Sequence, residues 1–436
     1  MKRLINYINN NVLIKVASLN SAAVLLRIIS GFLTSKAIAI FIGPEGLALI
    51  GNLRNFLKSV QSFSTLGLYN GVVKYVSEFK NNVVELSKTI STVFYLGFIA
   101  TFIIALFSYY NADYLNQLVF GEYDYAYIFR ILALALPFYS LNIFSFSIIN
   151  GFSKYKILLV INIIGQVMGV FVTLLLIWQN NIDGALVAVV VTPSLLFLIT
   201  LVAIVNRKNF SKLVRADRFD LSTLKNLSSY SVMALVTAII LPLVTIAIRN
   251  YIIDNLSMRE AGYWEGMNRI STYYLMFVNS LLSLYILPRF SEIDSVKEFR
   301  KEVFDFYKTI MPVFGMGLLV IFLLKRFIVA IVFSPEFKPM EELFGWYLLG
   351  DFVKVLSVVI AYQFLAKRMF WHYIITEVFS VVTIYITSIY FIDLYGIKGA
   401  TIAHFVSYLA YYIVILLIFG TSLFGVIDEG ADKHKH

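Results

Sequence analysis

The sequence predicts an all-α protein that crosses a membrane many times, and three observations carry this prediction. Hydrophobic residues make up 59% of the 436 residues and charged residues only 14%, whereas soluble domains average about 45–50% and about 25%. The apolar residues fall into long runs, and a helix needs about 20 such residues to cross a bilayer. Cysteine is absent, so disulfides and thiolate sites are excluded. This composition excludes soluble enzymes, disordered proteins and nucleic-acid-binding domains.

Twelve apolar runs are long enough to span the bilayer. The second and eighth exceed its thickness and are expected to extend beyond it. Several contain an internal proline, which membrane helices tolerate as a bend. The expected spans are 16–41, 46–76, 87–110, 125–149, 156–179, 183–205, 227–251, 260–287, 306–332, 342–366, 370–392 and 397–421.

The charges between the spans predict an orientation. The 111–124 loop holds Asp113, Glu122 and Asp124 but no Lys or Arg, whereas the 206–225 and 289–308 segments are rich in both. Because Lys and Arg concentrate in cytoplasmic loops, this asymmetry predicts that both termini are cytoplasmic. The region from Lys325 to Lys338 goes against the bias.

The two halves of the chain resemble each other at a shift of about 215 residues. The segment 182–185 aligns with 397–400, and Asn52 aligns with Asn268. The shift covers six spans, so the repeat is parallel, as in transporters whose site lies between two such halves. The alternative is chance similarity between apolar helices. The predicted division is a six-helix lobe at 1–205, a basic linker at 206–226, a second lobe at 227–421 and a polar tail at 422–436.

Nine cations are assigned to the membrane region of the chain, apart from those at the outermost ends of the spans, and each would cost roughly 2.5–3.5 kcal/mol at a helix centre. Four of them lie near helix ends, where snorkelling to the interface is the alternative to a functional role. Arg27 is deeper, on a face with small and polar residues. The nine are Arg27, Lys36, Arg54, Lys58, Lys74, Arg130, Arg249, Arg269 and Lys354, of which the four near helix ends are Lys36, Lys74, Arg130 and Arg249.

The second span carries one polar stripe, formed by Arg54, Lys58, Gln61 and Thr65 at helical spacing. Such a stripe either lines water or forms a polar seam between helices. The eighth span, which the repeat aligns with the second, carries a similar polar set with Glu265, Asn268 and Arg269. It also holds Tyr273 and Tyr274, aromatic residues that could stack on sugars or pack against lipid.

The tenth to twelfth spans add acids and a histidine. Asp351 and Lys354 stand three residues apart and are expected to form a salt bridge. Glu377 is the best candidate for a buried acid. His404 is expected either to titrate near neutrality or, as the alternative, to serve only as a hydrogen-bond donor between packed helices.

The chain lacks the sequence signatures of catalysis and of nucleotide, cofactor or metal binding. It has no Walker A motif, no H-E-x-x-H and no G-x-S-x-G, and its predicted loops are short. These absences predict a transporter with no catalytic residue, cofactor or metal. The excess of cations over acids within the spans favours an anionic substrate, because Arg forks match phosphate oxygens.

Seven motifs resemble the Wzx polysaccharide flippases of the multidrug/oligosaccharidyl-lipid/polysaccharide (MOP) superfamily, in particular the O-antigen and enterobacterial common antigen translocases. They follow the order of that family over most of the chain. The motifs are FIGPEGL (41–47), NLRNF (52–56), YNGVVKYV (69–76), SVMAL (231–235), Ile248-Arg249, GYWEG (262–266) and LGDFVKV (349–355).

The resemblance implies two six-helix lobes in a V around a central cavity, in the bacterial inner membrane. It implies an undecaprenyl-pyrophosphate-linked oligosaccharide that is moved to the periplasmic leaflet by alternating access, with the polysaccharide polymerase and the chain-length regulator as partners besides membrane lipids. By matching motif, it assigns Arg54, Lys74, Arg249, Asp351 and Lys354 to the cavity.

The predicted site combines these motif positions with those argued from the residues alone. The predicted cations are Arg27, Arg54, Lys58, Lys74, Arg249, Arg269 and Lys354, and the predicted polar or coupling residues are Asn52, Gln61, Glu265, Asn268, Asp351 and Glu377. The main alternative function is a cation-coupled multidrug exporter of the same superfamily. A peptidoglycan-precursor flippase, expected to have fourteen spans, and a sugar-handling membrane enzyme are less well supported.

Overall fold

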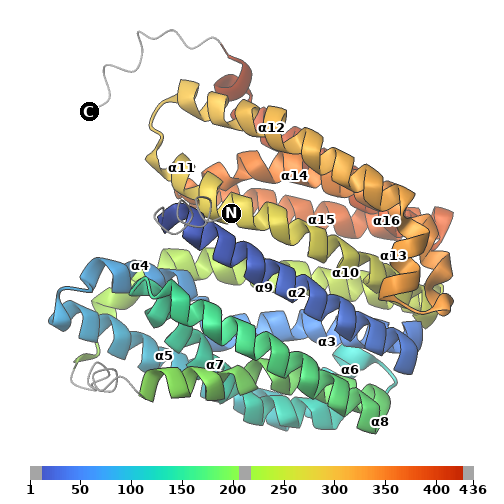
Figure 1. Ribbon diagram of the computed structural model, residues 1–436, viewed down its shortest axis with the longest axis horizontal. Coiled ribbons are helices and arrows are strands. Elements are labelled where there is room, and N and C mark those ends of the chain that lie inside the picture. The colour runs from blue at the N-terminus through green and yellow to red at the C-terminus, as the bar shows by residue number, and fades with distance from the viewer. Residues whose placement is uncertain (1–11, 206–217, 426–436) are drawn as a thin grey trace, which may run out of the picture. The chain divides into compact units, whose positions relative to one another are not determined.

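The computed structural model describes residues 12–205 and 218–425, and every regular element in these ranges is helical (Figure 1). The predicted all-α class is therefore confirmed. The helices are α2 Val12–Phe41, α3 Gly43–Ser64, α4 Tyr69–Phe79, α5 Val83–Tyr110, α6 Ala112–Phe120, α7 Ala126–Gly151, α8 Tyr155–Val205, α9 Leu221–Asn255, α10 Met258–Leu281, π-helix η3 Leu282–Ile286, α11 Leu287–Glu292, α12 Val296–Leu323, α13 Lys325–Val332, 3₁₀-helix η4 Pro335–Leu343, α14 Phe344–Ala366, α15 Phe370–Tyr395 and α16 Ile397–Phe424.

The helices are compatible with the twelve predicted spans. Ten helical stretches in the described residues are long and apolar enough to cross a membrane. One of them, within α8, joins two helices at Asn180 and Asn181, where the backbone leaves the helical region. The more polar α3 is not among the ten, yet it covers most of the predicted second span.

Side-chain caps explain where several helices begin. Asn82 accepts hydrogen bonds from the backbone N–H groups of Val84 and Glu85 at the start of α5. Ser257 caps α10 and Ser295 caps α12 in the same way, each accepting from a backbone N–H three residues later. These caps satisfy N–H groups that have no partner within the helix.

The second span is interrupted, contrary to the single long helix expected over 46–76. A turn between Ser64 and Tyr69 separates α3 from α4, with Leu66 at φ 52° and Gly67 at φ 61°. Neighbouring helices bind the freed end of α3, because Thr101 on α5 donates to the Ser64 carbonyl at 2.9 Å and Ser140 on α7 donates to the Ser64 hydroxyl at 3.2 Å. The eighth span is long as expected, but η3 widens its helix into a π-turn before α11.

By internal contacts the described chain forms two compact units, which are considered separately. Unit 1 comprises the chain up to Arg249 with Val332–Ser334, and unit 2 comprises Asn250–Ile331 with the chain from Pro335 onward. Most of α9 therefore packs in unit 1. The lobe and linker boundaries at 205 and 227 stay a prediction, and residues 206–217 of that linker lie outside the described residues.

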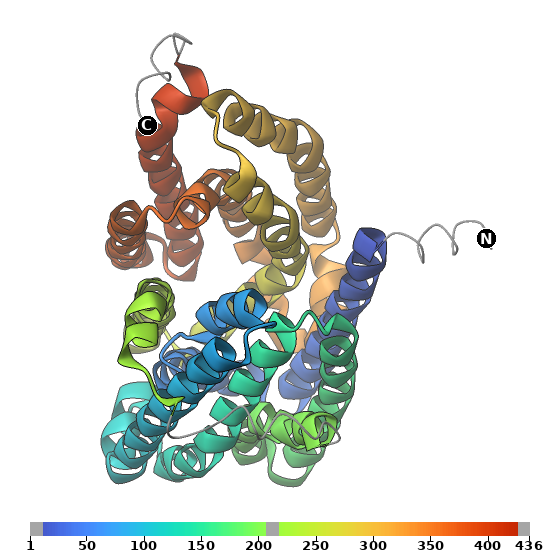
Figure 2. The same ribbon diagram turned by 90° about the vertical axis from the view of Figure 1, so that its left-hand side faces the viewer.

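In unit 1, α7 is the central helix and packs against α4, α5, α6 and α8. In unit 2, α14 has this role and packs against α10, α12, α15 and α16. Figure 2 views the helices nearly along their axes, with α16 in red beside the orange helices of the same unit. A buried cluster that includes Leu282, Val359 and Phe419 fills the space around α14.

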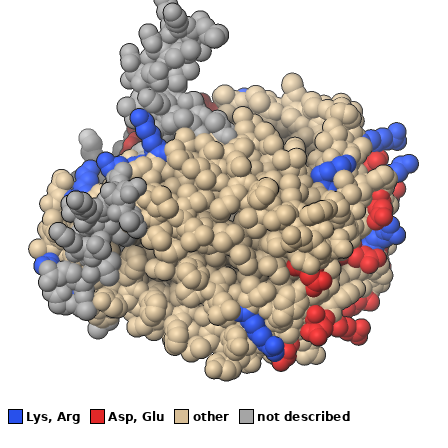
Figure 3. All heavy atoms as spheres, turned by 60° about the horizontal axis from the view of Figure 1, so that its bottom comes forward, with Lys and Arg blue, Asp and Glu red and all other residues tan. Residues whose placement is uncertain are grey.

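The outer helix surfaces are apolar. Large side chains such as Phe98, Phe171 and Trp178 on unit 1 and Leu319 on unit 2 are exposed. Figure 3 shows a broad uncharged surface with Lys, Arg, Asp and Glu gathered toward its ends. An exposed apolar band bounded by charges suits a hydrocarbon environment, so the chain is a multi-pass membrane protein.

Replacing Gly67 by Ala is expected to destabilise the fold, because an L side chain in the left-handed region costs roughly 1–2 kcal/mol. The matched control is Gly317→Ala on α12, where an added Cβ meets nothing within 4 Å and the backbone is helical. Thermal unfolding in detergent should give a lower Tm for Gly67→Ala and an unchanged or higher Tm for Gly317→Ala. Equal melting of the two variants would contradict this account of the turn.

Candidate functional site

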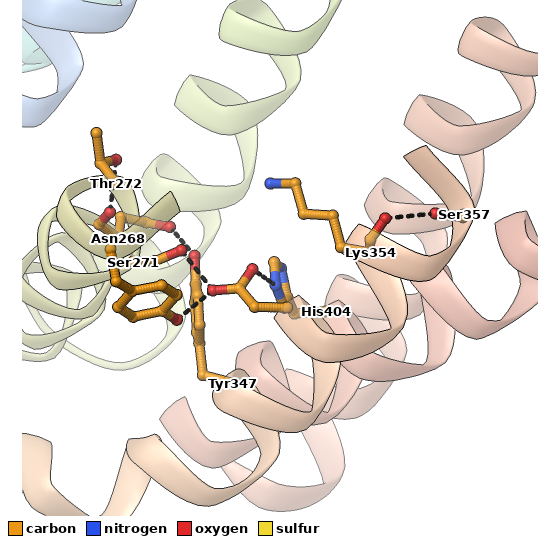
Figure 4. A network of polar contacts seen from close by, with 9 residues as sticks. Asn268, Ser271, Thr272, Tyr347, Lys354, Ser357 and His404 are labelled. Atoms are coloured by element: carbon orange, nitrogen blue, oxygen red, sulfur yellow. Dashed lines mark hydrogen bonds and ion pairs between the residues drawn. The ribbon is translucent and has the colours of Figure 1, made fainter. Parts of the chain in front are cut away.

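The most connected polar cluster lies in unit 2 and centres on Asp351 of α14, whose side chain is 0% exposed (Figure 4). Ser271 on α10 donates to Oδ2 of this carboxylate at 2.5 Å, and the Tyr274 hydroxyl on the same helix donates to the same oxygen. On the opposite side, Nε2 of His404 on α16 lies 3.0 Å from Oδ1. The carboxylate therefore joins three helices, and we name this cluster the Asp351 network.

Aromatic rings fix the histidine of this network. Tyr347, one turn before Asp351 on α14, stacks on His404 with ring centroids 4.1 Å apart and 17° between planes. Its hydroxyl donates to Oδ1 of Asn268 on α10. Tyr408, one turn after His404, meets the imidazole edge to face at 4.8 Å. The imidazole is thus held between two tyrosines, as Figure 4 shows for the labelled Tyr347.

Gly350 makes the close approach of α14 and α16 possible. A Cβ at this position would lie 2.3 Å from Cδ2 of His404 and 3.1 Å from the backbone N of Phe405. Only a residue without a side chain allows the imidazole to pack against α14 at this level. The Gly350-Asp351 pair therefore supplies both the space and the acceptor for His404.

The electrostatics of the network follow from its burial. Transferring a carboxylate out of water is costly unless hydrogen bonds and opposite charge compensate it. Asp351 has two hydroxyl donors and an imidazole, and the positive charge of Lys354 acts on it as well. A buried imidazole beside a carboxylate is an arrangement that can take up and release a proton.

The predicted salt bridge between Asp351 and Lys354 is wrong. Among the described residues Asp351 pairs with His404 instead, and the ammonium of Lys354 lies over the ring of Tyr408, 4.9 Å from its centroid. In Figure 4 no dashed line joins the Lys354 ammonium to the network. The physical reason is that donors from α10 and α16 already surround the carboxylate, while the long lysine stem reaches an aromatic face. Glu377 on α15 is half-buried and near enough for its charge to act on Lys354.

A second buried charged pair lies on α10. Nε of Arg269 is 3.3 Å from Oε1 of Glu265 one turn away, with the two side chains 5% and 9% exposed. The two predicted site charges therefore bind each other. Removing one partner of such a pair costs about 3–5 kcal/mol because it leaves the other charge uncompensated, so this pair is a structural element of α10.

In unit 1 a buried polar contact joins Arg249 and Asn52. Nη1 of Arg249, on α9, donates to Oδ1 of Asn52 on α3 at 2.7 Å, and Nδ2 of Asn52 donates to the Val119 carbonyl on α6 at 2.9 Å. Arg249 is 0% exposed, so snorkelling does not explain it. Asn52 and Asn268, which the repeat aligns, thus both use their amides to tie a second helix.

The remaining predicted residues of unit 1 differ in exposure. Along α3, Arg54 and Gln61 are half-buried and Lys58 is exposed. The residues of the predicted polar stripe therefore differ in their exposure to solvent. Thr65 caps the end of α3 by donating to the Gln61 carbonyl at 2.9 Å. Lys74 on α4 lies 4.8 Å from the ring centroid of Tyr75, and Arg27 on α2 is exposed.

The predicted residues are divided between the two units. The set in unit 1 is Arg27, Asn52, Arg54, Lys58, Gln61, Lys74 and Arg249, and the set in unit 2 is Glu265, Asn268, Arg269, Asp351, Lys354 and Glu377. A single cavity lined by both sets stays a prediction. No group of three His, Cys, Asp or Glu in the described part of the chain could hold a metal ion.

Sequence reasoning missed several members of the Asp351 network. Ser271, Tyr347 and Tyr408 were not singled out, and Tyr274 was expected to stack on sugar or lipid. The spacing of Tyr347, Asp351 and Lys354 at i, i+4 and i+7 places all three on one face of a helix, and this signal could have found Tyr347. Nothing in the sequence indicates that Ser271 reaches the carboxylate.

Tyr274→Phe is expected to destabilise unit 2, because it removes one hydroxyl donor from a buried carboxylate. Such a loss costs about 1–3 kcal/mol. The control is Tyr390→Phe, at an exposed tyrosine of α15. Thermal unfolding should lower the Tm of the first variant only, and equal values would show that the Tyr274 hydroxyl is not needed.

Gly350→Ala is expected to cost about 1–3 kcal/mol, because the new methyl group forces His404 away from Asp351. Gly345→Ala on the same helix is the matched control, since the nearest atom to its Cβ, Cε2 of Phe322, is 3.7 Å away. Thermal unfolding compares the two variants. A Tm of Gly350→Ala equal to that of Gly345→Ala would disprove the close contact.

Comparisons with known proteins cover most of the chain. The lipid III flippase of Escherichia coli (strain K12) is 28% identical over 402 residues, which are 92% of this chain and 96% of the relative. Among solved structures, the inward-facing conformation of a multidrug resistance MATE family transporter of the MOP superfamily has a TM-score of 0.76 at 11% identity, covering 92% of this chain and 95% of that one. The lipid II flippase MurJ, inward closed, has a TM-score of 0.69 at 15% identity, covering 94% and 88%.

These relatives are transporters and flippases, in agreement with the predicted transporter, and the two structures share the fold of this chain. The family described as polysaccharide biosynthesis protein matches residues 13–294. That match spans more than half of the sequence and includes the unit 1 set together with α10. The chain therefore belongs to the polysaccharide biosynthesis protein family.

Proposed function

We propose that this protein is a flippase for an undecaprenyl-pyrophosphate-linked oligosaccharide, an O-antigen or enterobacterial common antigen repeat unit. It moves this lipid from the cytoplasmic to the periplasmic leaflet of the bacterial inner membrane. The observation that carries the proposal is the similarity to a lipid III flippase over 92% of this chain and 96% of that protein. The multidrug transporter resembles the chain at 11% identity, which supports the shared fold alone.

The charges of the described residues support an anionic substrate. Arg54 and Lys58 on α3 and Lys354 on α14 are half-buried or exposed cations in an otherwise apolar protein. Arginine binds phosphate oxygens through its planar fork, and lysine binds them as a point charge. A diphosphate would compensate such cations, whereas a cationic drug would be repelled by them.

The buried cations have a different role in this proposal. Arg249 is held by Asn52, and Arg269 is held by Glu265. The first contact ties α9 to α3, on which Arg54 and Lys58 stand, and the second stabilises α10. Arg249 and Arg269 thus have structural roles, while Arg54, Lys58, Lys74 and Lys354 contact the diphosphate. Arg27, exposed on α2, joins the second group.

Movement requires an energy source and alternating access to the two sides. Asp351 with His404, and Glu377, are the groups suited to carry a proton. The membrane potential also acts on the charged lipid, with about 2.3 kcal/mol per charge per 100 mV. We place both termini in the cytoplasm from the Lys and Arg bias, and the polymerase and chain-length regulator act on the product outside.

The test is complementation of a bacterial strain that lacks its O-antigen or common antigen flippase, read by blotting surface glycan. Wild type should restore the glycan. Arg54→Ala and Lys354→Gln should each lower it at least about tenfold, because a charge-assisted contact contributes about 1.5–3 kcal/mol. The matched control is Lys398→Gln, whose exposed ammonium pairs with Glu342.

Membrane expression of each variant is measured alongside. Normal glycan with both Arg54→Ala and Lys354→Gln would remove these residues from the site. If wild type restores no glycan and the purified protein binds no undecaprenyl-pyrophosphate oligosaccharide, the proposed function is wrong.

A further inference from the structure

The acidic end of unit 1 carries an ordered aromatic surface that the proposed transport step does not use. Between α6 and α7 the chain makes a tight turn that begins at Gly121, whose φ is +63°. Asn116 of α6 holds both sides of this turn, since its Nδ2 donates to the Tyr123 carbonyl at 2.7 Å and its Oδ1 accepts from the Tyr125 backbone N–H at 2.8 Å. The turn is therefore fixed by the protein itself.

Three rings stack in order on this turn. Tyr125 meets Phe120 edge to face with centroids 5.2 Å apart, and Tyr123 stacks on Tyr125 at 6.2 Å with only 11° between planes. Phe120 is buried, while the outermost ring, that of Tyr123, is 44% exposed. The Tyr123 ring thus lies nearly parallel to the Tyr125 ring, and the residue keeps exposed surface that an apolar ligand face can contact.

Carboxylates stand on both sides of this ring. Glu122 and Asp124 are exposed and make no hydrogen bond or ion pair with the residues that the structure describes. Asp183 is engaged, because the Tyr127 hydroxyl donates to it at 2.5 Å. Burial and the nearby Asp183 carboxylate raise the pKa of Tyr125, which keeps its phenol neutral within the stack.

We propose that the Tyr123 ring, with Glu122 and Asp124 beside it, is a binding platform for an uncharged sugar residue of an oligosaccharide. A pyranose has a face of C–H bonds that packs on an aromatic ring, and hydroxyl groups at its edge that donate to carboxylates. The absence of Lys and Arg from residues 111–124 makes the surface repel phosphate. The platform therefore selects the sugars of a lipid-linked oligosaccharide and excludes its diphosphate.

The surface differs from the tyrosines that anchor membrane proteins at the lipid interface. Such anchors are amphipathic rings at the level of the headgroups, whereas Tyr123 lies in a turn between two exposed carboxylates. The fixed backbone also lowers the entropic cost of binding. This inference rests on the proposed function only for the origin of the sugar.

The test uses the full-length protein in phosphatidylcholine nanodiscs, with a panel of soluble oligosaccharides of neutral, N-acetylated and acidic sugars, and inorganic pyrophosphate as the counter-probe. Saturation-transfer NMR reports contact and gives Kd by titration. We expect neutral or N-acetylated oligosaccharides to bind with no competition from pyrophosphate. Tyr123→Ala should weaken binding about five- to tenfold, and Tyr123→Phe, which keeps the ring, should retain most of it.

The control variant is Tyr110→Ala, which removes a 78% exposed tyrosine at the end of α5, outside the stack. Equal Tm values of all variants exclude misfolding as the cause of lost binding. No binding by any member of the panel above that of empty nanodiscs, equal loss in Tyr123→Ala and Tyr110→Ala, or competition by pyrophosphate would each overturn the platform. Restoration of surface glycan by wild type without sugar binding would overturn the platform alone. Binding of soluble sugars, with no restoration of glycan and no binding of an undecaprenyl-pyrophosphate oligosaccharide, would overturn the proposed function alone.

Discussion

A carboxylate inside a membrane protein needs donors from the protein, and in unit 2 this requirement organises the helices. Asp351 has no exposed surface, so hydrogen bonds from α10 and the imidazole from α16 replace its hydration. Each of these contacts requires α10 or α16 to lie at one particular level along the axis of α14. The hydrogen bonds to the Asp351 carboxylate thus set the relative position of α10, α14 and α16. The buried apolar cluster packs around these helices.

Unit 1 shows the complementary case of a buried cation. Arg249 donates to an amide oxygen on α3, and this hydrogen bond offsets part of the cost of burying its charge. The Asp351 network and the Arg249–Asn52 contact thus join helices around a buried anion and a buried cation. Paired or hydrogen-bonded charges of this kind are the ones that an apolar environment permits. The more accessible cations of α3 and α14 are distinct from them, and this distinction underlies the assignment of positioning and substrate-binding roles.

Sequence reasoning found the elements of the fold more readily than the contacts of the site. Hydropathy and length suffice to predict an all-α membrane protein, because the bilayer sets the length of apolar helix that can cross it. The break between α3 and α4 was missed, since the polar and apolar residues around Gly67 also suit a continuous helix. The wrong pairing of Asp351 with Lys354 has a similar origin: neighbours on one helix are visible in the sequence, whereas Ser271 and His404 come from distant segments. Which of several possible partners a side chain contacts is decided by the tertiary structure.

The contact between Gly350 and His404 has a mechanical consequence for any movement of unit 2. The imidazole occupies a notch that one glycine leaves on α14, and the rings of Tyr347 and Tyr408 stand on either side of it. Sliding α16 along α14 would drive the imidazole ring against neighbouring side chains, because the ring fits against α14 only at the level of Gly350. Close packing of this kind favours movement of α14 and α16 as one body, and the π-turn at Leu282–Ile286 is an irregular helical segment outside the two helices.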